Sequence, residues 1–278
     1  MDIDSLRDKY AGKCVMVTGG AGSVGTAIVK ALLKLDAVPY VFDHSEPSLV
    51  RLLRGHNVDY YLGDVRLAED IQRAISGCKI EHCIHAAAYK HVDLLEGFRV
   101  EAHRNNVLGA RNLLDILRGS VDKLTLISTD KAVEPSSVMG TTKKQAEHEF
   151  LDRNQTVVRF GNVLFSSGSV LEIWDKQIQA SKPITVTDPE MKRYLMTLDE
   201  AAGLVLHAAG TGGVNILRMG DPVTVGQLAQ RFLNKRGCPS GVTHIIGTRP
   251  GEKKIEKLHS DTERLIETDH PFIYKVVH

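Results

Sequence analysis

The side chains best suited to chemistry follow an apolar run, Leu124–Ser128, that is typical of a buried strand. Thr129, Asp130 and Lys131 come directly after it and supply a hydroxyl, a carboxylate and an ammonium group, which are types that transfer protons in enzymes. Open parallel sheets bind ligands beyond the carboxyl ends of their strands, so we expect these side chains to face a substrate. The alternative interpretation is that they only form a turn.

A second group of this kind lies in the segment Met139-Gly140-Thr141-Thr142-Lys143. The segment opens a predicted helix, and its spacing places Lys143 about one turn after Met139. The segment Met139–Lys143 is therefore a further candidate part of the site, beside Thr129, Asp130 and Lys131.

A glycine motif follows the first predicted strand, Cys14–Thr18. Glycines at positions 19, 22 and 25 give GxxGxxG, and those at 20, 22 and 25 also satisfy GxGxxG. They permit a tight turn and close approach of the backbone to a pyrophosphate, which would lie at the N-terminal end of the helix that contains Ala27–Leu35. The motif therefore predicts a dinucleotide-binding loop that uses Gly19, Gly22, Ser23, Val24 and Gly25.

The residue that closes the second predicted strand, Pro39–Phe42, is Asp43. A carboxylate there accepts hydrogen bonds from the adenosine ribose hydroxyls, which favours NAD because a 2′-phosphate would be repelled. His44 leaves NADP as an alternative, and Asp43 is otherwise a solvated turn residue. We expect further cofactor contacts, or in the case of the alanines only tight packing, from His44, Ser45, Asp64, Val65, Ala86, Ala87, Ala88, Asn106 and Lys143.

The elements that must position these residues alternate along the chain. Short β-branched runs, such as Val58–Leu62, His82–Ala86 and Thr156–Phe160, are separated by segments with helical periodicity. This alternation predicts an α/β fold with a doubly wound parallel Rossmann sheet and a small C-terminal substrate-binding lobe. We expect residues 1–160 to form the NAD(P)-binding domain, and residues 161–278 to form mainly the lobe, interleaved with the last strands of the sheet.

Composition excludes several classes of protein. The net charge is +1, from 35 basic and 34 acidic residues, and no long basic run is present, so nucleic-acid binding is not expected. The four cysteines show no CxxC pair, which favours reduced, packed thiols and no metal site. The N-terminal residues are charged and no apolar run is long enough to span a membrane, so we expect a cytoplasmic protein without membrane insertion.

Beyond these patterns, the sequence resembles a known family. The glycine motif, the strand-end Ser-Thr-Asp and the spacing of Met139 to Lys143 resemble extended short-chain dehydrogenases, whose usual YxxxK pair supplies a phenol base and a ribose-binding lysine. More closely, the chain is similar to nucleotide-sugar 4,6-dehydratases of polysaccharide biosynthesis that act on UDP-N-acetylglucosamine. The matching blocks are HAAAYKHV (His85–Val92), NVLGARN (Asn106–Asn112), STDKAVxPxxxMGTTK (Ser128–Lys143), VRFGNVLFSSGSV (Val158–Val170), ITVTDPEMKRYLMT (Ile184–Thr197) and RPGEK (Arg249–Lys253).

The resemblance implies transient oxidation of the sugar at C4, loss of water across C5 and C6, and a product with a 4-keto-6-deoxy sugar. It implies that Lys131 is the base at C5, provided that its ammonium group is desolvated, and that Asp130 protonates the departing C6 hydroxyl. Thr129 would bind O4, and Lys143 would hold the nicotinamide ribose. Met139 departs from the dehydrogenase pattern, because a thioether cannot accept the O4 proton; Asp130, directly or through water, is the expected substitute.

The resemblance also implies a UDP-sugar substrate. Arginines can bind its diphosphate with two hydrogen bonds each, and a carboxylate can accept from the uridine ribose. From the residues alone, an exposed arginine is more often a solvated charge. The expected substrate-binding residues are Lys90, His91, Asn162, Arg193, Arg249 and Glu252.

Family members commonly continue beyond RPGEK or carry a membrane-embedded N-terminal region, whereas this sequence ends soon after that block. We therefore expect a uracil pocket that is partly open or completed by another subunit. Helices at 106–117 and 140–153 pair between subunits in related folds, so a homo-oligomer, at least a dimer, is expected. Two other functions stay open: a UDP-sugar 4-epimerase, which needs no base at C5, and a non-catalytic NAD(P) sensor, suggested by Met139.

Overall fold

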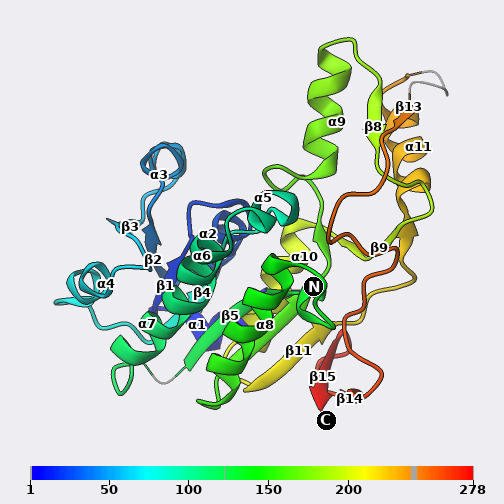
Figure 1. Ribbon diagram of the computed structural model, residues 1–278. Coiled ribbons are helices and arrows are strands. Elements are labelled where there is room, and N and C mark those ends of the chain that lie inside the picture. Colours follow the sequence, from blue (N-terminus) through cyan, green and yellow to red (C-terminus); the bar gives the residue numbers. More distant parts are fainter. Residues whose placement is uncertain (1, 122, 239–242, 278) are drawn as a thin grey trace.

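A nine-stranded sheet forms the centre of the computed structural model, which describes residues 2–121, 123–238 and 243–277 (Figure 1). From β3 to β11 along the sheet, neighbouring strands are parallel, whereas β15 and β14 are antiparallel. The predicted parallel Rossmann sheet is thus confirmed. In sheet order the strands are β14 (Arg264–Glu267), β15 (Ile273–Val277), β11 (Gly213–Leu217), β6 (Thr156–Phe160), β5 (Lys123–Thr129), β4 (His82–His85), β1 (Cys14–Thr18), β2 (Val38–Asp43) and β3 (Asp59–Leu62).

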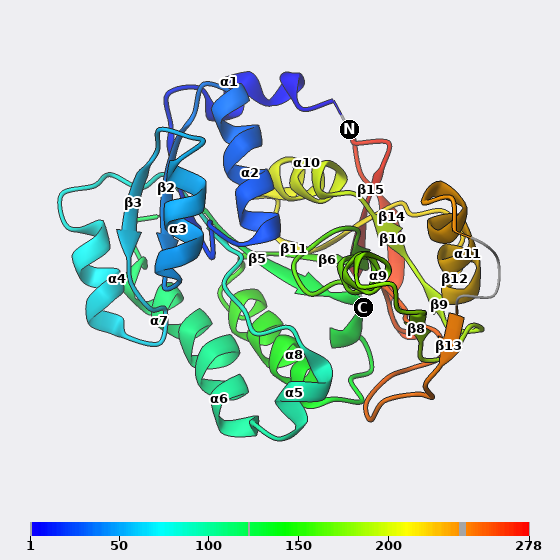
Figure 2. The same cartoon turned by 90° about the horizontal axis from the view of Figure 1, so that it is seen from above.

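Helices cover both faces of this sheet, as the predicted double winding requires (Figure 2). On one face Ile28, Leu32 and Val205 belong to one buried apolar cluster, and on the other Leu113 and Phe150 belong to a second. The helices of the first face are α2 (Ser23–Lys34), α3 (Glu46–Leu53) and α10 (Leu198–Ala208), and those of the second are α4 (Ala68–Ile75), α7 (Gly109–Ile116) and α8 (Val138–Leu151).

Shorter helical segments connect these layers. They are η1 (Asp4–Leu6), α1 (Arg7–Tyr10), α5 (Val92–Glu96), α6 (Arg99–His103), the π-helix η2 (Arg104–Leu108) and the 3-10 turn η3 (Asp130–Ala132). Two of them matter for the site, because α5 follows β4 and η3 follows β5 at the same edge of the sheet.

The strand boundaries predicted from the sequence lie within one residue of those in the structure. The predicted strands Cys14–Thr18 and Thr156–Phe160 coincide with β1 and β6. Two boundaries differ in ways that matter for function. β5 includes Thr129, so this residue is held by the sheet, and α2 begins at Ser23, so the last glycine of the motif, Gly25, lies in the first helical turn.

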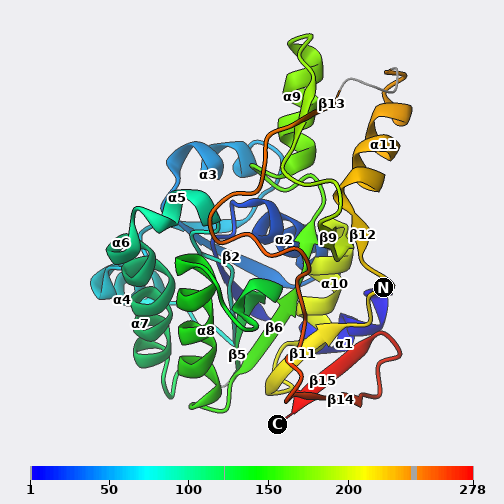
Figure 3. The same ribbon diagram turned by 45° about the vertical axis from the view of Figure 1, so that its right-hand side comes forward.

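A lobe beyond the sheet has its own apolar core. It contains α9 (Val170–Gln179), β8 (Ile184–Val186) and α11 (Val225–Lys235), and Figure 3 shows both helices extending away from the sheet. Trp174 and Phe232 are buried in this core, and the Trp174 indole N–H donates to the carbonyl oxygen of Thr185 at 2.7 Å. Three short strand pairs complete the lobe: β7 (Asn162–Val163) with β10 (Leu195–Met196), β9 (Lys192–Arg193) with β12 (Val223–Thr224), and β8 with β13 (Thr243–Ile245).

A buried ion cluster ties the C-terminal part of the chain to the sheet. The Arg159 side chain on β6 is only 1% exposed. Its guanidinium donates to both carboxylate oxygens of Glu147 on α8 at 2.8 Å, and to Glu263, which precedes β14, at 3.0 Å. Ser128 also donates to Glu147, at 2.6 Å. The cluster therefore joins β5, β6, α8 and the C-terminal segment.

The thiols and the helices bear on two further expectations. All four cysteines are free, and burial raises the pKa of the Cys83 thiol to about 12. Cys78 is exposed rather than packed, because it lies in the turn after α4. Within the described ranges, no helix has both the length and the apolar character needed to cross a bilayer.

We expect Arg159→Met to lower the free energy of unfolding by ~3–5 kcal/mol, because two buried carboxylates would lose their cation. Urea unfolding at neutral pH measures this change. The matched control is Arg153→Met, since Arg153 pairs with Glu149 at the surface and its loss should cost less than about 1 kcal/mol. Equal losses in the two variants would contradict a structural role for the buried cluster.

Candidate functional site

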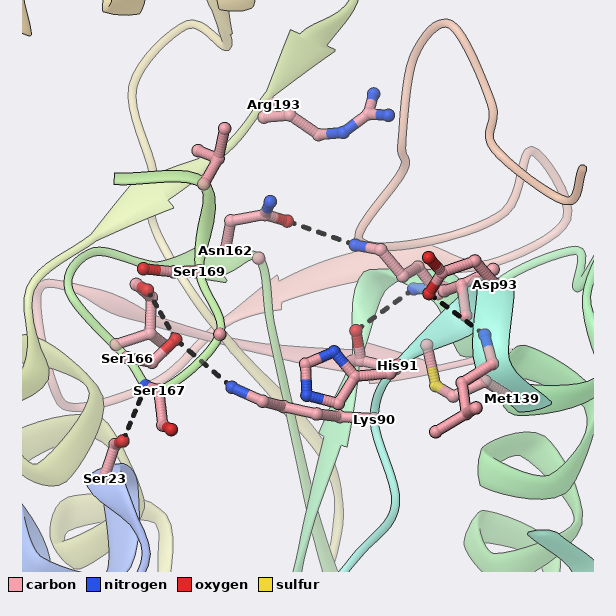
Figure 4. A pocket seen from close by; sticks show the side chains of 18 of the residues that line it. Ser23, Lys90, His91, Asp93, Met139, Asn162, Ser166, Ser167, Ser169 and Arg193 are labelled. Carbon is pink, nitrogen blue, oxygen red and sulfur yellow. Dashed lines mark hydrogen bonds between the residues drawn. The ribbon is translucent and has the colours of Figure 1, made fainter. Parts of the chain in front are cut away.

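A cavity of about 850 Å³ opens beyond the carboxyl ends of β1, β4, β5 and β6, between the sheet and the lobe. The order of strands reverses between β1 and β4, and such a switch point is where open α/β sheets bind their ligands. Figure 4 shows polar side chains from both sides of the cavity pointing into it.

Most of the predicted site residues meet at this cavity. Its lining includes Gly19, Gly22, Ser23, Val24, Gly25, Ala86, Ala88, Lys90, His91, Thr129, Lys131, Met139, Lys143, Asn162, Arg193, Arg249 and Glu252. The predicted residues outside the lining are Asp43, His44, Ser45, Asp64, Val65, Ala87, Asn106 and Asp130.

The glycine loop has the form that a dinucleotide requires. A Cβ atom on Gly25 would collide with the carbonyl oxygen of Gly19, and one on Gly19 would lie 2.6 Å from the backbone nitrogen of Ala87. Gly19 also has a positive φ of 65°, which suits glycine. No side chain caps the start of α2 at Gly22, so the first N–H groups of the helix are free to bind an anion. These residues fit the pyrophosphate of a dinucleotide.

Asp43 shapes this loop from the end of β2. One of its carboxylate oxygens accepts from the backbone N–H of Ala21 at 3.0 Å, and the other accepts from that of Ser45 at 2.9 Å. Each oxygen keeps a second lone pair, so the geometry leaves room for the predicted ribose contact, which stays a prediction.

Asn106 and Val65 are buried behind the lining of the cavity. The Asn106 amide accepts from the Tyr89 backbone N–H at 2.8 Å and donates to the Tyr89 carbonyl and to Thr142. It thereby holds the loop that carries Lys90. Val65 is buried beside Gly109 in the core. Neither residue lines the cavity, and the predicted cofactor contacts of both stay predictions.

The candidate proton-transfer groups form one hydrogen-bonded cluster. Thr129 donates to Asp130 Oδ1 at 2.9 Å, and Lys131 Nζ donates to the same oxygen at 2.9 Å. Lys131 also donates to Asn162 Oδ1 at 3.1 Å. The Asp130 side chain is 0% exposed, whereas Thr129 and Lys131 line the cavity. The expectation that Asp130 faces the substrate is therefore corrected: it communicates with the cavity through its two neighbours.

Helix α8 brings Met139 and Lys143 to the same wall. Ser137 caps the helix by accepting from the Gly140 N–H at 3.1 Å. A side chain at position 140 would collide with the carbonyl oxygen of Lys131, so glycine allows α8 to pack directly on η3. Lys143 Nζ donates to the Ile127 carbonyl oxygen at 2.6 Å, and burial lowers the pKa of this ammonium group to about 8.

The predicted substrate-binding residues face this wall from the lobe side and from α5. Arg193 is buried, with its guanidinium held by the carbonyl oxygens of Lys192 at 2.9 Å and Lys254 at 3.3 Å. Arg249 forms an ion pair with Asp93 of α5 at 3.1 Å. The lobe loop is thus tied to the helix that follows β4.

A serine-rich loop is a part of the site that sequence reasoning missed. Residues 166–169 were not among the predicted site residues, but all four line the cavity. The backbone N–H of Ser167 donates to Ser23 Oγ at 2.8 Å, and Lys90 approaches Ser166 Oγ at 3.4 Å, as Figure 4 shows. Ser169 Oγ is buried with no hydrogen-bond partner among the described residues. The glycine and serine content of this stretch, within the matching block Val158–Val170, was the available signal.

These features define the class of the protein. A doubly wound sheet, a glycine loop at its switch point and a hydrogen-bonded polar cluster at the end of β5 are those of a Rossmann-type α/β fold of the short-chain dehydrogenase/reductase kind. More specifically, the chain belongs to the polysaccharide biosynthesis protein family, whose model matches residues 15–278.

Three relatives illustrate this membership. Capsular polysaccharide biosynthesis protein CapD of Staphylococcus aureus is 38% identical over 95% of this chain, and the chain spans only 48% of CapD. UDP-glucose 4-epimerase of Rickettsia canadensis is 33% identical over 96% of this chain and 83% of the relative. The X-ray structure of Pen from Bacillus thuringiensis superposes with a TM-score of 0.89 at 30% identity, covering 95% of this chain and 89% of Pen.

The buried Lys143 predicts a pH dependence of stability. Its pKa falls from the ordinary 10.5 to about 8 on folding, so between these values the unfolded protein binds more protons and the free energy of unfolding rises with pH. We expect the protein to gain roughly 3 kcal/mol over this window relative to Lys143→Met. Urea unfolding of both proteins at a series of pH values measures the difference. Parallel pH profiles would show that the ammonium group is solvated.

Proposed function

We propose that this protein is a UDP-N-acetylglucosamine 4,6-dehydratase that uses bound NAD and forms a UDP-4-keto-6-deoxy sugar for surface polysaccharide. The observation that carries the proposal is the cluster of Thr129, Asp130 and Lys131 on the cavity wall, since it offers both an acid and a base to a sugar. Membership of the polysaccharide biosynthesis protein family and the likeness to CapD and Pen support the class of reaction.

The cofactor is inferred from the loop and from Lys143. Free N–H groups at the start of α2 would hold the pyrophosphate, and Asp43 would accept from the adenosine ribose, which favours NAD over NADP. The ammonium group of Lys143 would donate to the nicotinamide ribose and stabilise negative charge near O4. When bound, NAD would supply reversible oxidation at C4 and reduction at C6.

Thr129 and Asp130 would carry the first proton. Met139 cannot take it, and the Thr129 hydroxyl lies between the cavity and the buried carboxylate. As the Thr129 hydroxyl accepts the O4 proton, it passes its own proton to Asp130. Asp130 is thus the base that takes the role of the tyrosine in the dehydrogenase pattern. Asp130 later returns this proton by the same route to the departing C6 hydroxyl, so the proton leaves as part of the water.

Lys131 would act at C5. The C5 proton is acidic once C4 is a ketone, because the carbanion is stabilised by the carbonyl group. An amine form of Lys131 takes this proton and returns it to C5 when C6 is reduced. Every proton is then accounted for without an outside acid or base.

The lobe and α5 would hold the UDP part. Arg193 and Arg249 provide guanidinium groups for the diphosphate, and Glu252 provides a carboxylate for the uridine ribose. Burial lowers the pKa of Lys90, and together with His91 and Asn162 it would position the sugar.

A second candidate is a UDP-sugar 4-epimerase, which the relative from Rickettsia canadensis favours. An epimerase returns the hydride to C4 from the other face and does not need a base at C5. The hydrogen bonding of Lys131 within the proton-transfer cluster supports the dehydratase instead.

Mass spectrometry of UDP-N-acetylglucosamine incubated with the protein, with NAD or NADP supplied, tests this directly. We expect a product lighter than the substrate by the mass of one water. A product of unchanged mass with an altered sugar, separated by chromatography, would instead establish the epimerase. UDP-glucose serves as the comparison substrate.

Substitutions in the cluster should separate binding from chemistry. We expect Lys131→Ala and Asp130→Asn each to lower kcat by about 10²–10⁴-fold, because each removes a proton-transfer group. Binding of NAD, measured by calorimetry, should be unchanged, and Lys30→Ala on the exposed side of α2 is the matched control. Turnover of Lys131→Ala within a few-fold of the parent would refute the assignment of the C5 base.

A further inference from the structure

A second buried carboxyl group, that of Glu256, lies beside Asp130 and Lys131. The Glu256 side chain is 3% exposed, and its Oε1 lies 3.9 Å from Lys131 Nζ. Its Oε2 is buried without a hydrogen-bond partner in the described part of the chain, as is Oδ2 of Asp130. The segment before Glu256 is fixed to β9, because the Lys192 N–H donates to the Lys254 carbonyl oxygen at 2.8 Å. The position of Glu256 is therefore set by the fold.

The other cations near Glu256, Arg193 and Lys253, donate their hydrogen bonds to other groups. Glu256 faces Lys131 and Asp130 of η3, Arg193 of β9 and Lys253 of its own segment. Arg193 donates to backbone carbonyl oxygens, and Lys253 Nζ donates to that of Val133 at 2.9 Å. Lys131 is closer to Asp130, at 2.9 Å. In the described residues, neither Arg193 nor Lys253 is hydrogen-bonded to Glu256. The ammonium group of Lys131 is therefore the close cation for both buried carboxyl groups, those of Asp130 and Glu256.

Such an arrangement keeps one carboxyl group neutral. Two like charges in a desolvated site with a single close counter-ion raise the free energy of the doubly ionised state. Asp130 has the short contact with Lys131 and hydrogen bonds from two donors, which stabilise its ionised form. Burial raises the pKa of the Glu256 carboxyl, although Lys131 opposes this shift. The proton therefore belongs on Glu256.

We propose that Glu256 is a positioning residue that holds a proton beside Lys131 and so leaves Asp130 as the single counter-ion of Lys131. This inference rests on the proposed dehydration. An ionised Glu256 would hold Lys131 in its ammonium form and prevent it from accepting the C5 proton. Activity should therefore decline on the alkaline side as Glu256 loses its proton.

Two substitutions and a pH profile test this role. Glu256→Gln keeps the shape and the neutral state, so kcat for UDP-N-acetylglucosamine should stay within about threefold of the parent. Its alkaline limb should move to higher pH or disappear. Glu256→Ala removes the group that spaces Lys131 and should lower kcat on the order of 10- to 100-fold, with exchange of the C5 hydrogen in deuterated water slowed in parallel. A Glu256→Gln protein as slow as Glu256→Ala, or with an unshifted limb, would overturn the proposal.

A measurement independent of turnover separates this inference from the proposed function. The infrared difference spectrum of the parent minus Glu256→Gln at neutral pH should contain the C=O stretch of a protonated carboxyl group. A carboxylate band in its place would refute the inference even if dehydration is observed. Conversely, a protonated band in a protein that never dehydrates UDP-sugars would overturn the positioning role by contradicting the proposed function, while leaving the protonated state of Glu256 established.

Discussion

The hydrogen-bonded pair of Asp130 and Lys131 is the interaction on which the candidate site depends. Asp130 is withdrawn from solvent, and its ionised form is stabilised by donors from Thr129 and Lys131 at 2.9 Å. A buried carboxylate without such partners would be neutral or would destabilise the fold. The charges of Asp130 and Lys131 therefore depend on the distances between their side chains. The elements that pack around the end of β5 hold these side chains in place.

Adjacent residues of β5 divide these tasks, because successive side chains of a strand point to opposite faces of the sheet. Ser128 points toward α8 and donates to Glu147 of the buried ion cluster. Thr129 points to the cavity and donates to Asp130. The same strand therefore anchors α8, which supplies Lys143, and presents the candidate proton-transfer group Thr129 to the cavity. Gly140 completes the arrangement by letting α8 contact the backbone of Lys131.

Local sequence patterns were enough to predict much of the fold, the glycine loop and the strand-end residues of the cavity, whereas the substrate-binding residues of the lining were expected only from the family resemblance. The strands of the Rossmann sheet are β-branched runs, and the glycine loop has a fixed spacing, so both can be identified from neighbouring residues alone. Burial of Asp130 could not be predicted, because it depends on packing by α8 and η3 that no local pattern encodes. Glu256 was missed for a similar reason: it reaches Lys131 only through the pairing of its segment with β9. The side chain of Val65 packs into the core beside Gly109, so a cofactor contact of this residue, which stays a prediction, would involve its backbone.

The two buried charge clusters differ in a way that bears on function. Arg159 satisfies Glu147 and Glu263 with short hydrogen bonds on all sides, as a structural cluster requires. In the cluster around Lys131, by contrast, one oxygen of Asp130 and one of Glu256 lack partners in the described residues. Buried polar atoms left in this state cost free energy, and a packed apolar core would be as stable or more so. Such a cluster beside a cavity supports the proposed proton transfer, since a carboxyl oxygen without a hydrogen-bond partner is able to accept a proton.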